Sequence, residues 1–174
     1  IRSNVSIGDG VYKSEDGGET WKHIGLKNSG RISRIVIHPN DSDKVYVGSL
    51  GHAYSPQKER GVFVTHDGGN SWKHTLFVDQ NTGISDIVMD TDNPRILFAG
   101  AWHLELKTLQ RISGGPGSGI FKSTDAGMSW NRLKGNGLPN NDVGKIALAM
   151  TPAAPDRLYA LIETGDGVPY NGCL

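Results

Sequence analysis

Three aspartates recur at one position of a short polar motif, where a carboxylate can either bind a cation or close a turn. Asp16, Asp67 and Asp125 each stand two residues after a Ser or Thr and two residues before a Gly. A calcium loop needs several oxygen ligands in series, whereas no second acid recurs at a fixed spacing in these motifs. We therefore expect the aspartates to accept hydrogen bonds from backbone N–H groups of a tight turn, and we expect no metal and no cofactor.

The aspartates lie in a segment that the chain carries three times. The copies align without gaps as GVYKSEDGGETWKHIGL from Gly10, GVFVTHDGGNSWKHTLF from Gly61 and GIFKSTDAGMSWNRLKG from Gly119. Their common pattern is Ser/Thr-x-Asp-x-Gly-x-Ser/Thr-Trp, in which Gly permits a positive φ and Trp supplies a large apolar surface. The pattern predicts a hairpin turn with a structural set of residues: Ser14, Asp16, Gly18, Thr20, Trp21, Thr65, Asp67, Gly69, Ser71, Trp72, Ser123, Asp125, Gly127, Ser129 and Trp130.

A second family of segments lies between the copies and supplies two more strands per unit. RISRIVIHPNDSDKVYVGS from Arg31, GISDIVMDTDNPRILFAGA from Gly83 and KIALAMTPAAPDRLYALIE from Lys145 each read strand, polar turn, strand. Four short strands, A to D, in about 50 residues are typical of one propeller blade. The sequence therefore predicts an all-β fold: a partial β-propeller of four-stranded antiparallel blades over residues 1–174, about three blade equivalents in total. Its parts are strands C and D of blade one (10–26), blade two (31–78), blade three (83–134) and strands A and B of blade four (143–163).

The three motif copies resemble the Asp-box, or BNR, repeat. That repeat occurs in sialidases, in xyloglucan-degrading propeller hydrolases, in the sortilin-type (VPS10) receptor domain and in exported bacterial proteins similar to sortilin. The stretches between the boxes look most like this bacterial sortilin-like group. The resemblance implies a secreted, periplasmic or cell-surface location, but it does not decide activity, because these families share the turn and differ in their chemistry.

The predicted blades have two faces of different character. Strands in a meander alternate in direction, so the A–B and C–D turns share one face and the B–C and D–A connections share the other. We call these the turn face and the loop face. The loop face carries long B–C connections, from about Leu50 to Arg60 and from about Trp102 to Ser118, and such loops often carry function. The candidate ligand-binding residues there are His52, Tyr54, Glu59, Arg60, Asp79, Trp102, His103, Glu105 and Arg111.

Binding and catalysis remain alternative functions, and no catalytic residue is assigned. The resemblance to sialidases implies an Arg-Ile-Pro start that is absent here, since Arg31-Ile32-Ser33 matches it only in part. Hydrolases of the xyloglucanase type need two carboxylates across a cleft, and nothing pairs Glu59, Asp79, Asp86 or Glu105 by spacing. We favour a binding or scaffold domain for a glycan or for a protein or peptide ligand, with a glycoside hydrolase as the alternative.

The composition of the chain excludes some classes of partner and of structure. Eighteen basic residues balance eighteen acidic ones, so the chain lacks the broad positive field that nucleic acid requires, and we expect no nucleic-acid partner. No stretch approaches the roughly 18 apolar residues of a membrane span. The single thiol, Cys173, cannot form an internal disulfide. Closed propellers need about four to eight blades, so we expect the terminal strands to meet further blades of the same chain or of another subunit.

Overall fold

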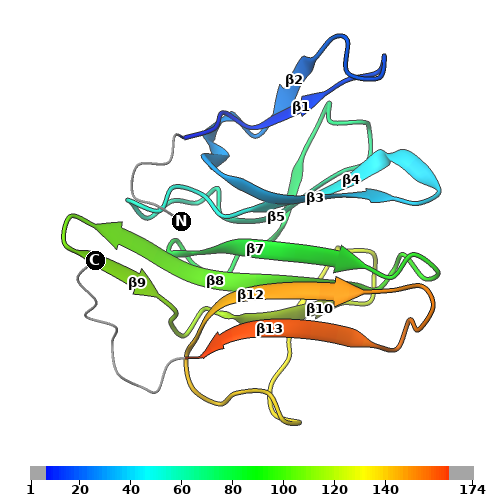
Figure 1. The fold of residues 1–174 in the computed structure, drawn as a ribbon. Coiled ribbons are helices and arrows are strands. Elements are labelled where there is room, and N and C mark those ends of the chain that lie inside the picture. Colours follow the sequence, from blue (N-terminus) through cyan, green and yellow to red (C-terminus); the bar gives the residue numbers. More distant parts are fainter. Residues whose placement is uncertain (1–6, 165–174) are drawn as a thin grey trace.

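The computed structural model describes residues 7–164, and residues 1–6 and 165–174, which include Cys173, lie outside the described part (Figure 1). The described residues form strands and one short 3-10 helix, with no α-helix among them, and the predicted all-β fold is confirmed. In chain order the elements are β1 (Val11–Lys13), β2 (Lys22–Gly25), η1 (Lys27–Ser29), β3 (Ile32–His38), β4 (Asp41–Ser49), β5 (Gly61–Thr65), β6 (Lys73–Leu76), β7 (Thr82–Met89), β8 (Leu97–Lys107), β9 (Gln110–Ser113), β10 (Gly119–Ser123), β11 (Asn131–Arg132), β12 (Val143–Met150) and β13 (Leu158–Thr164).

The strands form antiparallel blades that stack side by side, from blue β1–β2 to orange-red β12–β13 in Figure 1. Blade two has the order β3-β4-β5-β6, and blade three has the order β7-β8-β10-β11. The pairs β1–β2 and β12–β13 form two-stranded sheets at the two ends of the stack, and we refer to them as blade one and blade four. The A–B turns lie on the right in Figure 1 and the β8–β9 hairpin lies on the left, so the turn face and the loop face are at opposite ends of the strands.

The hydrophobic core lies between blades rather than within one sheet. Tyr46 and Val62 of blade two pack with Ile84 and Ile87 of blade three in one cluster, and all four are fully buried. Burial of an aliphatic side chain of this size contributes about 1.5–3 kcal/mol, so each inter-blade contact is a large part of the stability. A second cluster joins blades three and four, and its buried members are Val88, Phe98, Ile120, Val143, Ile146 and Leu148.

Each C–D hairpin carries a polar contact that the eight-residue motif did not predict. The second residue after the motif Trp reaches back to the carbonyl just before the Gly that begins strand C. His23 Nε2 lies 2.7 Å from the Asp9 carbonyl, His74 Nε2 lies 2.9 Å from the Arg60 carbonyl, and an Arg132 amino group donates to the Ser118 carbonyl. The repeat unit is therefore longer than the Asp box, because it includes this contact between the start of strand C and strand D, at the end of the hairpin opposite the turn.

The B–C connection of blade three differs from its prediction. We expected a loop from Trp102 to Ser118, whereas β8 continues to Lys107 and folds back as β9. The reason is an apolar alternation in β8: Trp102, Leu104 and Leu106 are all buried, in a third cluster with Leu50 and Ala53 of blade two. The extended hairpin thus lies on the long connection of the neighbouring blade.

Candidate functional site

The Asp boxes form closed hydrogen-bond systems at the turn face. In the second box, Asp67 Oδ1 accepts from the Thr65 hydroxyl at 2.7 Å and from the Ser71 backbone N–H at 2.9 Å. Asp67 Oδ2 accepts from the Ser71 hydroxyl at 2.6 Å, while Thr65 Oγ1 accepts from the Gly69 N–H at 2.9 Å. The Ser71 bonds, followed by the Thr65 hydroxyl, lower the pKa of Asp67 to about 2.

The first and third boxes repeat this geometry. Thr20 N–H and Ser129 N–H donate to Asp16 Oδ1 and Asp125 Oδ1, both at 2.9 Å, and the same kind of bonds hold the pKa of each aspartate well below its ordinary value. Each carboxylate is thus occupied by its own turn. Among residues 7–164, no group of three or more His, Cys, Asp or Glu side chains is placed to hold a metal ion.

The motif tryptophans take different positions along the stack of blades. Trp72 donates its indole N–H to the Ile24 carbonyl of blade one at 2.7 Å. Trp130 donates to Gly127 of its own turn at 3.1 Å and packs, half-buried, against the cluster between blades two and three. Trp21 also bonds within its own turn, to the Gly18 carbonyl at 3.0 Å, but it is 63% exposed.

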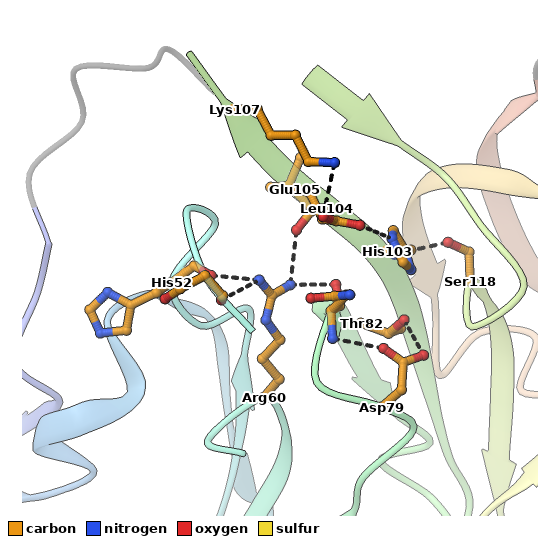
Figure 2. Close-up of polar contacts among 11 residues, drawn as sticks. His52, Arg60, Asp79, Thr82, His103, Leu104, Glu105, Lys107 and Ser118 are labelled. Atoms are coloured by element: carbon orange, nitrogen blue, oxygen red, sulfur yellow. Dashed lines mark hydrogen bonds and ion pairs between the residues drawn. The ribbon is translucent and has the colours of Figure 1, made fainter. Parts of the chain in front are cut away.

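The loop face contains a polar network around Arg60, shown in Figure 2. Arg60 is fully buried, and among residues 7–164 the acceptors of its guanidinium are backbone carbonyls. The acceptors are His52 at 2.5 Å and Ser55 at 3.4 Å in its own connection, Leu104 at 3.1 Å on β8, and Asn81 before β7. Arg60 therefore joins three segments of two blades.

Burial lowers the pKa of Arg60 to about 10, partly offset by the negative charges of Asp79 and Glu105. The side chain is still a cation at neutral pH, and the four carbonyl dipoles replace the water it has lost. Arg60 was predicted as a surface residue of the loop face. The structure instead places it beneath that face, where it positions the segments above it.

Trp102 is likewise buried, at 1% exposure, rather than presented to solvent. Its indole N–H donates to Ser113 Oγ on β9 at 3.0 Å, and that hydroxyl donates to Glu163 Oε2 of blade four at 2.7 Å. The Arg111 guanidinium and the Lys145 ammonium each lie 5.9 Å from the centre of the indole ring. Trp102 thus anchors the β8–β9 hairpin, and its ring is unavailable for stacking on a ligand.

The acidic residues of the loop face are held in different ways. Asp79 closes a turn, accepting from the Asn81 N–H at 2.7 Å and from the Thr82 hydroxyl at 2.8 Å. Glu105 Oε1 lies 3.0 Å from His103 Nε2, and Glu105 Oε2 lies 3.8 Å from Lys107 Nζ. A hydrogen bond from Gln57 at 3.1 Å lowers the pKa of Glu59.

Asp86, the fourth carboxylate considered for a cleft, belongs to the interface between blades three and four. Its Oδ2 accepts from the Leu148 N–H at 2.8 Å, and its Oδ1 lies 3.8 Å from Arg34 Nε. Figure 2 shows Asp79, His103 and Glu105 near Arg60. Asp86 instead bonds to Leu148 of blade four.

Three buried polar atoms of this network have no hydrogen-bond partner among the described residues: Arg60 Nε, Asn81 Oδ1 and His103 Nδ1. The His103 backbone is nevertheless fixed, since its N–H donates to Ser118 Oγ at 2.9 Å. Buried polar groups usually find a protein or water partner, so these three atoms are the ones in this network that retain hydrogen-bonding capacity.

The surface of the loop face is formed by other residues. Tyr54 is 47% exposed, with the Arg31 guanidinium 5.9 Å from its ring centre, and Arg111 is exposed. His52 and Glu59 are half-buried. At the tip of the hairpin Leu109 is 90% exposed, a residue that the sequence-based site prediction did not include. The alternation of apolar and polar residues from Trp102 to Lys107 was the signal that could have placed Leu109 at a hairpin tip.

A cavity of about 280 Å³ lies beside the third D–A connection, between blades three and four. Ile120, Leu138 and Ile146 give it an apolar lining, and Arg132, Asn140 and Asp142 give it a polar one. Arg132 donates to the Pro116 carbonyl at 2.6 Å in addition to the Ser118 carbonyl of the hairpin contact described above, so one side of the cavity is fixed. In the part of the chain that the structure describes, no helix is long and apolar enough to cross a membrane.

Comparison with known proteins gives a family and a fold. A family model described as sortilin, neurotensin receptor 3, matches residues 9–135. Two similar curated proteins are both named vacuolar protein sorting/targeting protein 10. The one from Kluyveromyces lactis is 33% identical over 69 residues, and the one from Pyricularia oryzae is 31% identical over 93 residues. These matches cover 40% and 52% of this chain but only 4% and 6% of the relatives.

Solved structures of similar fold include two GH74 proteins. A GH74 enzyme of Niastella koreensis superposes with a TM-score of 0.62 at 20% identity, over 87% of this chain and 21% of that one. The GH74 xyloglucanase of Xanthomonas campestris has a TM-score of 0.62 at 18% identity, over 87% of this chain and 23% of that one. At such identities the likeness concerns the fold, which agrees with the propeller blades described above.

Proposed function

Because the chain belongs to the sortilin/Vps10 family, we propose that it is part of an exported receptor-like propeller that binds a protein or peptide on its loop face. The observation that carries this proposal is the contrast between the two faces. The Asp boxes use their polar atoms within their own turns, whereas the loop face combines long connections with exposed side chains such as Tyr54, Leu109 and Arg111. Binding surfaces are usually built in this way, from loops held by a rigid scaffold.

The network around Arg60 supports a binding role because it makes the loop face rigid. A surface whose segments are fixed before the ligand arrives loses less conformational entropy on binding. Arg60 joins the connection around His52 to Asn81 and to Leu104, and the β8–β9 hairpin is held by Trp102. The fixed segments are the ones that carry the exposed side chains.

Catalysis is the less supported alternative. A glycosidase needs one carboxylic acid that keeps its proton near neutral pH. Glu59 has its pKa shifted in the opposite direction, and Asp79 accepts two hydrogen bonds in its own turn. What keeps the alternative open is that Glu105 stands beside His103 and near Asp79 (Figure 2), on the loop face, whose B–C connection in blade two carries Glu59.

A scaffold role toward further blades is supported by exposed apolar residues on β3 of blade two, next to the two-stranded blade one, and on β13 at the other end of the stack. Ile35 and Ile37 on β3 are 47% and 58% exposed, and Tyr159 and Leu161 on β13 are 63% and 77% exposed. Exposed rows of large apolar residues mark interaction surfaces. We propose that further blades of the same chain or of another subunit cover them, as the central blades cover one another.

The binding proposal is tested by probing peptide and glycan arrays with the full chain. Binding of the strongest ligand is then measured for variants of the chain. Tyr54→Ala should weaken binding with an unchanged melting temperature, whereas Glu19→Ala on the turn face should leave binding unchanged. A ligand that responds to Glu19→Ala and not to Tyr54→Ala would contradict the proposal. Release of reducing ends from xyloglucan, lost in Glu105→Gln, would replace it by the hydrolase alternative.

A further inference from the structure

The chain is neutral overall, but its charges are distributed unequally between the two faces. The turns of the turn face (residues 14–21, 38–44, 65–72, 90–96, 123–130 and 151–157) hold ten acidic and three basic residues. The connections of the loop face (residues 7–9, 25–31, 50–60, 77–81, 102–118 and 133–142) hold seven basic and five acidic residues. Separated charges of this kind create an electrostatic potential that orients and attracts a charged ligand, although the net charge is zero.

Around Arg60 and the β8–β9 hairpin, the acidic groups Asp79 and Glu105 are more strongly engaged than the basic groups at the surface. Asp79 is closed into its turn, and Glu105 is shared between His103 and Lys107. Lys107, with its side chain 56% exposed, is held by Glu105 only at 3.8 Å, and such an exposed pair is weak. Arg111 is exposed over the indole ring of Trp102. At the β8–β9 hairpin, the exposed charges are therefore the positive ones of Lys107 and Arg111.

The β8–β9 hairpin places this charge beside an exposed apolar side chain. Lys107 pairs with Gln110 across the hairpin, so Thr108 and Leu109 form the tip, where Leu109 is 90% exposed. Directly below the tip, the Leu106 N–H donates to the Ala53 carbonyl at 2.7 Å, next to the half-exposed Tyr54. Leu109 thus lies at the tip of a hairpin that carries Lys107 on one face and Arg111 on the other, and Tyr54 follows the residue that bonds to its base.

We propose that the tip of the β8–β9 hairpin, with Tyr54 beside its base, binds an acidic peptide segment that carries an apolar side chain. This inference rests on the proposed binding function and specifies its ligand. The acidic groups of the peptide pair with Lys107 and Arg111, and its apolar side chain packs against Leu109 and Tyr54. Complementary charge increases the association rate, and an apolar anchor next to it gives the contact area that exposed ion pairs lack. A neutral glycan would offer neither cation an ionic partner.

The experiment measures binding of two synthetic peptides to the full chain by fluorescence anisotropy. One peptide has Asp and Glu around a central Leu, and the other has Lys at every acidic position. The acidic peptide should bind, with an affinity that falls as salt is raised, and the basic peptide should not. The charge reversal Lys107→Glu with Arg111→Glu should weaken binding about tenfold or more, and Leu109→Ser should weaken it at any salt concentration.

A matched control carries the same charge change on the other face. Arg95→Glu with Arg157→Glu, both exposed on the turn face, should change the affinity by less than about twofold, and melting temperatures of all variants establish that they fold. Equal losses in the two double variants, or equal binding of the basic peptide, would overturn the inference. So would binding to anionic phospholipid vesicles through the tip without peptide binding. A different ligand, bound at the loop face independently of the tip, would refute the inference and leave the proposed function intact. If no ligand of any class binds at the loop face, both proposals fail.

Discussion

The hydroxyl of Ser85 lies 2.6 Å from the carbonyl oxygen of Ile146, and this contact joins blade three to blade four. Ser33 makes the same contact one blade earlier, with its hydroxyl 2.6 Å from the Ile84 carbonyl. Each serine is also within reach of a carbonyl of its own blade, Gly100 for Ser85 and Gly48 for Ser33. The corresponding residue of blade four is Ala147, so the contact is a property of two interfaces and not of the repeat as a whole.

We predict that Ser85→Ala lowers the free energy of unfolding by about 1 kcal/mol, because a half-buried carbonyl loses its donor. Ser33→Ala should have an effect of similar size for the same reason. Urea denaturation measures both, with Ser42→Ala, an exposed serine of the turn face, as the control. A Ser85→Ala variant as stable as the Ser42→Ala variant would show that the inter-blade contact contributes nothing.

The second prediction concerns acid. The pKa of Asp67 falls from an ordinary 3.8 to about 2 in the folded chain, so the folded state favours the ionised carboxylate. The stability that this group supplies is fully present above about pH 4 and is lost as the pH falls through about 2. The melting temperature of the wild type should therefore drop between pH 4 and pH 2. It should drop less steeply in Asp67→Asn, which starts lower at pH 7. Parallel curves for the two proteins would contradict this.

The third prediction concerns the buried cation. Arg60→Met removes the donor from four carbonyls and should destabilise the chain by about 3 kcal/mol or more. Hydrogen exchange should increase in the connection around His52 and at Leu104, whose backbone segments Arg60 holds together. Arg95→Met at an exposed position of the turn face is the control, with an expected effect within about 0.5 kcal/mol. Weakened ligand binding by a fully stable Arg60→Met variant would instead support direct contact with the ligand.

The fourth prediction separates backbone conformation from crowding at two glycines. Gly61 has a φ of 133°, and a Cβ there would lie 1.9 Å from the Leu76 carbonyl oxygen. Gly17 has a φ of 72°, and a Cβ there would meet no atom within 4 Å. Gly17→Ala should cost about 1–2 kcal/mol for the left-handed conformation alone, whereas Gly61→Ala should cost clearly more, because the backbone of the hairpin must move. Thermal denaturation compares them, and equal costs would rule out the crowding.

The hairpins and the inner strands were predictable from the sequence, because their signals are local. The donors that bond to Asp67 lie between Thr65 and Ser71, within the Asp box. The short sequence motif therefore contains both partners of each of these bonds. The burial of Arg60 was not predictable, because its acceptors at Asn81 and Leu104 are 21 and 44 residues away. The β8–β9 hairpin lies between these cases. The alternation from Trp102 to Leu106 was visible, but the surface that covers it comes from Leu50 and Ala53 of the preceding blade.

The difference in length between the blades can be traced to one place. From the last paired residue of strand B to the first of strand C, blade two runs from Ser49 to Gly61 and blade three from Ala101 to Gly119. Blade three therefore absorbs its additional residues in the β8–β9 hairpin, while the spacing inside the Asp boxes stays constant. The blade thus tolerates a change of length at the loop face while its Asp-box turn at the opposite face keeps the same spacing. The variable segment can therefore be replaced without changing the turn face. Replacing only the tip of the hairpin, residues 107–110, leaves the buried Leu104 and Leu106 in place and is thus a direct route to a propeller of altered specificity.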